Sequence, residues 1–150
     1  MVPTRGLKYL LMPAATTPRW PTVLLSHELP DATSHVDWMI ASEPRGREPL
    51  VTFRVGSRID EMDAGQGLLA RRLDDHRAEY LTYEGRVSGN RGTVRRLTRG
   101  TVVSWERSGD RWQMEIEWPD PKGGLRRQNL RLSRRGAGSD AWLIEASGLR

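Results

Sequence analysis

The strongest constraint on the fold is a run of alternating side chains around residue 115. The apolar members of the run are Trp112, Met114, Ile116 and Trp118. The polar members between them are Gln113, Glu115 and Glu117. A period of two places all the apolar side chains on one face of an extended strand. The run therefore predicts an antiparallel strand with one buried face and one polar face.

Similar but shorter signals recur along the chain, separated by Gly, Asp and Pro turns. The predicted strands cover residues 22–26, 35–41, 50–55 and the segments from residue 93 onward, including 130–133 and 142–144. Many short strands with turn signals between them are typical of a small antiparallel barrel. We therefore predict a mainly all-β single domain, an antiparallel β-barrel over residues 21–150 with short helical or irregular segments. The Pro-rich residues 1–20 are expected to form an irregular lead-in.

The middle of the chain gives the weakest signals. Glycines at positions 56, 65 and 67 argue against one long helix, but a turn or two of helix is expected over residues 68–73. Residues 80–83 are interpreted as a short strand, and the glycines at 85, 89 and 92 predict a loop.

Several functional classes are excluded by what the sequence lacks. There is no cysteine, so disulfides, thiolate metal sites and a cysteine nucleophile are excluded. Walker, Rossmann and Gly-x-Ser-x-Gly motifs are also missing. No apolar run approaches the roughly 18 residues that a membrane helix needs, and residues 7–15 do not have the layout of a signal peptide. We expect a cytoplasmic protein without a membrane partner.

The net charge of +5 comes from arginine, because the only lysines are Lys8 and Lys122. Guanidinium groups bind phosphate bidentately, which makes a polyanionic partner plausible. A basic, solvated surface in a protein from a GC-rich genome explains the same bias.

The three histidines of the chain are His27, His35 and His76. His35 and Asp37 are one residue apart, so both side chains leave the same face of a strand. His27, His35 and Asp37 together form a reasonable ligand set for a divalent metal, Mn or Zn more than Ca. The alternative is that these histidines are ordinary surface or hydrogen-bonded residues.

The histidines belong to a series of motifs that resembles the 3'-phosphoesterase domain of bacterial DNA ligase D. Residues 35–38 (His-Val-Asp-Trp) resemble its His-Tyr-Asp-Phe core, and residues 75–80 resemble its Asp-His-Pro-Leu-x-Tyr motif. Residues 83–85, 92–94 and 142–144 are similar to its Phe-Glu-Gly, Gly-Thr-Val and Trp-Leu-Ile segments. These five matches occur in order over roughly residues 22–146.

The resemblance implies a barrel with a metal site that processes nucleic-acid 3' ends in DNA repair. The expected reaction is removal of 3'-phosphates or 3'-ribonucleotides from DNA or DNA/RNA junctions, with Mn as the first choice of metal and Zn or Co as alternatives. His27, His35 and Asp37 would be the metal ligands. His76 would contact the phosphate or act as an acid, and Tyr80 would help to orient it. Other repair proteins are possible partners.

Two departures from the family pattern affect the phosphate contacts. The family has an arginine where this chain has Met39, and a second arginine falls on Leu68. Arg71, Arg72 and Arg77 are the candidates to replace them as phosphate-binding residues. The departures favour an alternative function, a catalytically weakened or inactive module that binds nucleic-acid ends or a repair partner. A structural protein with no nucleic-acid role is the third reading.

Overall fold

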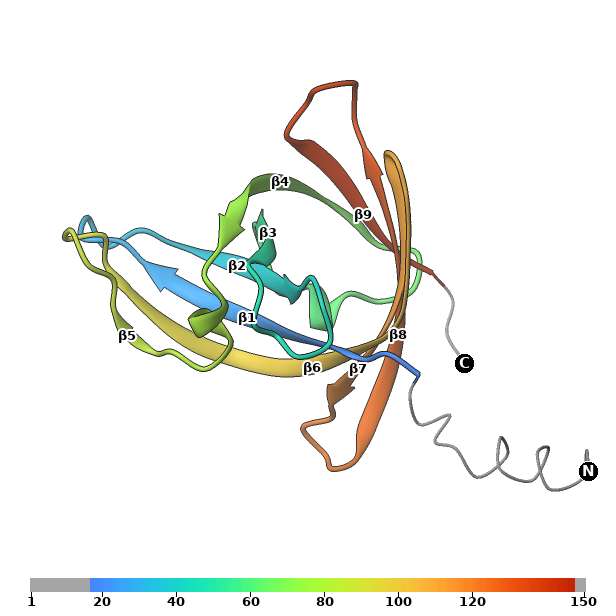
Figure 1. Ribbon diagram of the computed structural model, residues 1–150, viewed down its shortest axis with the longest axis horizontal. Helices are drawn as coiled ribbons and strands as arrows, with labels where there is room; N and C mark the ends of the chain where they lie inside the picture. The colour runs from blue at the N-terminus through green and yellow to red at the C-terminus, as the bar shows by residue number, and fades with distance from the viewer. Residues whose placement is uncertain (1–16, 148–150) are drawn as a thin grey trace, which may run out of the picture.

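Eight antiparallel strands close into a barrel in the computed structural model, which describes residues 17–147 (Figure 1). The strands are β1 (Trp20–Glu28), β2 (Ser34–Ala41), β3 (Leu50–Val55), β4 (Gly67–His76), β5 (Gly85–Arg86), β6 (Thr93–Ser108), β7 (Arg111–Pro119), β8 (Leu125–Arg134) and β9 (Ala141–Ser147). The order around the barrel is β1-β2-β3-β4-β9-β8-β7-β6, and β6 pairs with β1 to close it. The short β5 adds to the edge of β6. The all-β prediction is confirmed, while most of the expected lead-in lies outside the described residues.

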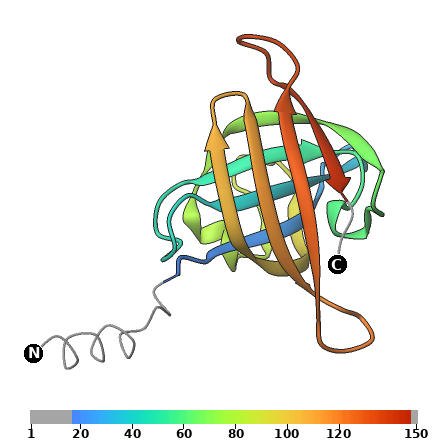
Figure 2. The same ribbon diagram turned by 90° about the vertical axis from the view of Figure 1, so that its right-hand side faces the viewer.

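The barrel consists of two groups of strands that cross each other. In Figure 2, β7 to β9 run steeply at the front, and β1 to β3 cross behind them. The 16-residue β6 belongs to both groups, because its first half pairs with β1 and its second half with β7. Gly100 lies between these halves, and a Cβ there would come within 2.5 Å of the Trp118 ring. The missing side chain is what allows the indole to pack against the strand where β6 changes partners.

Aromatic side chains fill the barrel interior. Trp38, Phe53, Trp112, Trp118 and Trp142 are all buried in one cluster. The four apolar residues of the alternating run in β7 are each at most 4% exposed, which confirms the predicted buried face. Burial of large apolar side chains is the main favourable contribution to folding, worth about 1.5–3 kcal/mol for each one.

Two of the buried indoles donate hydrogen bonds inside the barrel. Trp38 Nε1 donates to Thr22 Oγ1 at 2.8 Å, and Trp118 Nε1 donates to Gln128 Oε1 at 2.9 Å. These partners remove the penalty of burying an unpaired N–H group. The core therefore includes a polar side chain, Thr22 or Gln128, beside each of these two indoles.

Two of the predicted elements are wrong. Residues 68–73 belong to β4 rather than to a helix, because Leu68 and Ala70 face the interior while Leu69 is 65% exposed. Because the exposed Leu69 is also apolar, the sequence of this strand does not alternate between apolar and polar residues. Residues 80–83, expected as a strand, instead lie partly in the 3-10 helix η3 (Ala78–Leu81), and a second 3-10 helix, η2 (Ile59–Glu61), precedes β4.

A second, smaller apolar cluster covers the outer face of β1 and β2. It consists of Val23, Leu25, Met39, Ala41, Leu50, Leu81 and Val94. Leu81 comes from η3, so this cluster holds the segment between β4 and β6 against the outside of the barrel. That segment forms one wall of the candidate site. In the described part of the chain, no helix combines the length and apolarity needed to cross a membrane.

Candidate metal centre

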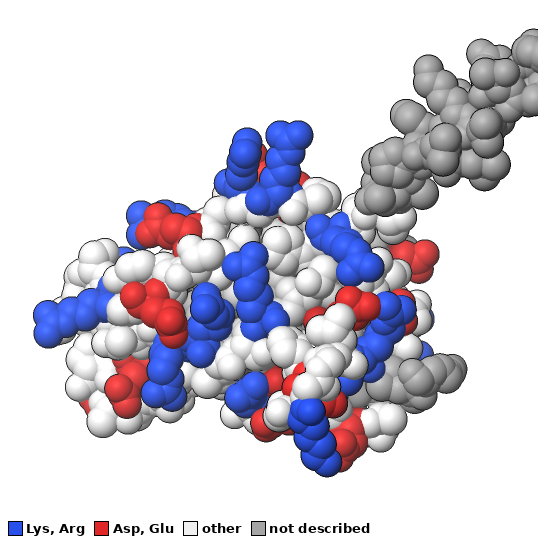
Figure 3. All heavy atoms as spheres, turned by 90° about the horizontal axis from the view of Figure 1, so that it is seen from below, with Lys and Arg blue, Asp and Glu red and all other residues white. Residues whose placement is uncertain are grey.

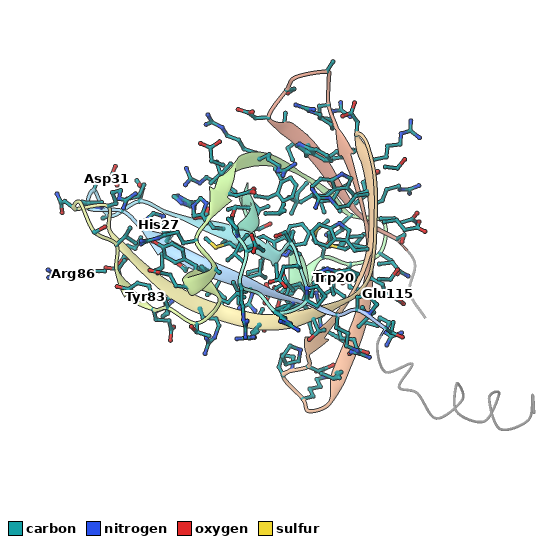
Figure 4. The ribbon with its side chains drawn as sticks, in the orientation of Figure 1. Trp20, His27, Asp31, Tyr83, Arg86 and Glu115 are labelled. Atoms are coloured by element: carbon teal, nitrogen blue, oxygen red, sulfur yellow. The ribbon has the colours of Figure 1, made fainter. Side chains whose placement is uncertain are left out.

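His27, His35 and Asp37 meet on the outer face of the barrel, at the ends of β1 and β2. The register pairs His27 directly with His35, and Asp37 is two residues further along β2. Val36 and Trp38 alternate with them and pack against the interior cluster. The predicted convergence of these three residues is confirmed by the geometry. Figure 4 places His27 at the end of the molecule that carries Asp31 and Arg86, far from Trp20.

The distances within the cluster suit a shared cation. His27 Nδ1 lies 3.7 Å and His35 Nε2 lies 3.5 Å from the same oxygen, Asp37 Oδ2. The ligand atoms of all three residues lie within 4.8 Å of one another. Ligands bound at about 2.1 Å to a tetrahedral ion would be about 3.4 Å apart. The two distances to Asp37 are close to this value, and the remaining separation between the two histidine nitrogens would have to contract to hold a divalent metal.

The backbone of the loop after β5 fixes the tautomer of His27. His27 Nε2 lies 2.6 Å from the carbonyl oxygen of Arg91. Because a carbonyl only accepts hydrogen bonds, Nε2 carries the hydrogen and donates it. Nδ1 of the neutral ring is then left with a lone pair facing Asp37, and this is the arrangement of a metal-binding histidine.

His35 carries the clearest sign that the cluster needs a further partner. Its Nε2 atom is buried and has no hydrogen-bond partner within the described residues. An unpaired buried polar atom costs about 1–3 kcal/mol. Burial of the imidazole is the main reason that the pKa of His35 is lowered, and the charges of Arg54 and His27 also lower it while Asp37 raises it. The neutral ring is thus favoured, and a metal ion accepts only the neutral ring as a ligand.

Arg54 on β3 completes the cluster, and it is the residue that sequence reasoning missed. It is the cross-strand partner of Asp37, and its Nε lies 3.3 Å from Asp37 Oδ1. One carboxylate oxygen is held by Arg54, while the other faces the two histidines. The sequence could have indicated Arg54 only if the predicted strands 35–41 and 50–55 had been paired in this register, which places Arg54 opposite Asp37.

A cleft of about 340 Å³ opens beside the cluster. Met39 and Val94 line it along with His27 and Asp37. The segment between β4 and β6 contributes Asp75, His76, Arg77, Tyr80, Val87, Ser88 and Arg91. His76 Nδ1 lies 2.8 Å from the Asp74 carbonyl oxygen, so Nδ1 donates to it, and Nε2 is left as the nitrogen that exchanges protons.

The structure separates the predicted catalytic and phosphate-binding residues into two groups. His76, Tyr80 and Arg77 line the cleft, whereas Arg71 and Arg72 are not among the residues lining it. Arg71 Nε lies 3.9 Å from Asp140 Oδ2 on the exposed surface. The guanidinium of Arg72 lies 5.0 Å from the centre of the Trp112 ring.

The two family departures also occupy different environments. Met39 is 1% exposed and packs in the outer cluster beside the cleft. Leu68 packs against the interior cluster, on the other side of the barrel wall from the ligands. Position 68 is therefore not beside the ligand set, unlike position 39.

No known family profile matches the sequence, and a search of curated proteins finds no significant match. The relationship to the phosphoesterase domain of DNA ligase D stays a prediction based on the ordered motifs.

Proposed function

We propose that this protein is a divalent-metal-dependent phosphoesterase that processes the 3' ends of nucleic acids, with Mn as the preferred ion. The observation that carries the proposal is the buried, unpartnered Nε2 atom of His35, 3.5 Å from Asp37 Oδ2 at the edge of a cleft. A divalent ion held by His27, His35 and Asp37 would polarise a phosphoryl oxygen and acidify a bound water.

The other residues of the cleft supply what phosphoryl transfer requires from the protein. Arg77 and Arg91 line the cleft, where Arg77 pairs with Glu79 at 3.2 Å and Arg91 donates to Ser88. Each would bind phosphate oxygens through its remaining N–H groups. Nε2 of a protonated His76 would donate a proton to the 3' oxygen as its bond to phosphorus breaks. The rings of His76 and Tyr80 lie 6.0 Å apart, so Tyr80 packs beside the imidazole and limits its orientation.

The second candidate function is a module that binds nucleic-acid ends, or a repair protein at such an end, without cleaving them. It is favoured by Met39, which puts a thioether where the resembling family has a phosphate-binding arginine. A site that binds metal and phosphate but lacks a cation at the transferring group would bind ends and turn over slowly.

An end-processing assay distinguishes the two functions. The substrates are labelled oligonucleotides that end in a 3'-phosphate or a 3'-ribonucleotide, incubated with Mn and, separately, with chelator. The proposal expects Mn-dependent product release by the parent protein, loss of release in Asp37→Asn, and normal release in Asp140→Asn, whose carboxylate lies outside the cleft. Tight binding of the ends without product would favour the binding module instead.

A further inference from the structure

Arg54 is the cation nearest to the proposed ligand set. Asp37 and Arg54 face each other across β2 and β3, and both side chains lie on the outer face because Trp38 and Phe53 point into the core. The Nε of Arg54 is 3.3 Å from Asp37 Oδ1, and the second oxygen of the same carboxylate faces His27 and His35. A single carboxylate therefore separates the guanidinium from the metal-binding atoms.

Most of the hydrogen-bonding capacity of Arg54 is available. A guanidinium carries five N–H donors, and only Nε of Arg54 has a partner among the described residues. The side chain is 39% exposed, so Nη1 and Nη2 are accessible to a ligand from solvent. Arg54 is not itself among the residues lining the cleft, but its partner Asp37 is. Its neighbours Arg71 and Arg72 are instead engaged with Asp140 and with the Trp112 ring.

The charges at the site favour an anion beside Arg54. With both imidazoles as neutral ligands, the negative charge of Asp37 is balanced by the positive charge of Arg54. A divalent ion would then leave an excess charge of about +2 in a largely buried cluster. A phosphate dianion matches this excess, and arginine binds phosphate oxygens in a planar, bidentate geometry.

We propose that Arg54 is a further phosphate-binding residue of this centre, beside Arg77 and Arg91. Its Nε positions Asp37 while its Nη groups bind a phosphoryl oxygen, so β3 supplies the guanidinium that position 39 on β2 lacks. The inference rests on the proposed function, because it assigns the phosphate contact of the same site.

The chain offers a close control for this role. Arg71 is the cross-strand partner of Arg54 on β4, and its side chain is 69% exposed. It pairs with Asp140, whereas Arg54 pairs with Asp37. Removing Arg71 therefore takes the same charge from the neighbouring strand without touching Asp37.

The test is calorimetric titration of inorganic phosphate into the Mn-saturated protein. We expect Arg54→Ala to lower phosphate affinity about tenfold or more, since a charge-assisted hydrogen bond is lost. Arg54→Lys should fall between parent and alanine, because lysine keeps the charge but not the fork. Arg71→Ala should bind phosphate like the parent.

Thermal unfolding of each variant shows whether it is folded, and Arg54→Lys replaces Arg54→Ala if the alanine variant is not. Parent-like phosphate binding by the folded Arg54 variants, or an equal loss in Arg71→Ala, would overturn the role of Arg54. A parent that binds no Mn overturns both this inference and the proposed function. If the parent binds Mn and phosphate, with Arg54-dependent affinity, but releases no 3' product, the role of Arg54 is supported and the hydrolytic function is contradicted.

Discussion

At the scale of single residues, His35 links the stability of the fold to the state of the cluster. Its ring is partly buried beside Asp37 and His27, and burial is the largest of several causes of its lowered pKa. In the unfolded chain the same imidazole titrates near its ordinary value of about 6.5. The unfolded state therefore binds a proton at a higher pH than the folded state does.

This difference predicts how stability depends on pH in the metal-free protein. As the pH falls below about 6.5, the unfolded state takes up a proton first, so the free energy of unfolding decreases until the folded-state pKa is passed. We expect His35→Gln to lose this part of the pH dependence. Urea unfolding of the parent and the variant between about pH 7.5 and 5 measures it, and parallel pH profiles would show that His35 makes no such contribution.

At the scale of elements, the loop between β5 and β6 is built into the metal centre. The carbonyl of Arg91 orients His27, and the next residue, Gly92, has a φ of 94°. A Cβ at Gly92 would lie 2.0 Å from the carbonyl oxygen of Glu28, so this backbone contact requires glycine. The loop, β1 and the ligand histidine therefore depend on one close backbone contact.

We expect Gly92→Ala to displace the loop and release His27 from its carbonyl partner. Loss of such a supporting hydrogen bond typically weakens metal binding about 10- to 100-fold. Gly89→Ala is the matched control, because Gly89 also has a positive φ (76°) but no backbone atom within 4 Å of the added Cβ. Mn titrations of the two variants measure the effect. Equal affinities would mean that the loop does not position His27.

The sequence predicted those elements whose pattern is local. The alternating run of β7 and the one-residue spacing of His35 and Asp37 follow directly from the period of a strand. β4 was missed because Leu69 is apolar on an exposed face, which removes the alternation. Arg54 was missed because its role depends on the register between two strands, and η3 because it is held by tertiary contacts of Leu81 rather than by a local period.

At the scale of the whole molecule, the arginines divide into paired and unpaired groups. Figure 3 shows basic side chains with acidic ones between them over the face viewed. Ion pairs to acidic residues engage Arg19, Arg54, Arg58, Arg71, Arg72, Arg77, Arg126, Arg127, Arg131 and Arg134. Within the described residues, the other ten arginines make no such pair. Five of these ten, Arg86, Arg91, Arg95, Arg96 and Arg99, come from β5, the loop after it and the first half of β6, and Arg91 lines the cleft. An unpaired group close to the cleft is a suitable contact surface for a nucleic-acid backbone.

We expect oligonucleotide affinity to fall steeply with salt, because arginine contacts release counterions from phosphate. Arg95→Gln/Arg96→Gln should lower the slope of log affinity against log salt by about 1–2. The control is the double variant Arg111→Gln/Arg135→Gln. It also removes two arginines that make no ion pair, but neither of them lines the cleft, so it should keep the parent slope. Fluorescence anisotropy from about 50 to 200 mM salt measures both. The same slope in all three proteins would contradict a contact surface near the cleft.

The central claim is that His27, His35 and Asp37 form one divalent-metal centre, and calorimetric titration of Mn tests it most directly. We expect a single site per chain, lost in Asp37→Asn and retained in Asp140→Asn. Binding should weaken as the solution is made acid, because protons compete with the metal for its ligand atoms. Absence of binding in the parent at neutral pH, or equal affinity in the parent and Asp37→Asn, would contradict the claim.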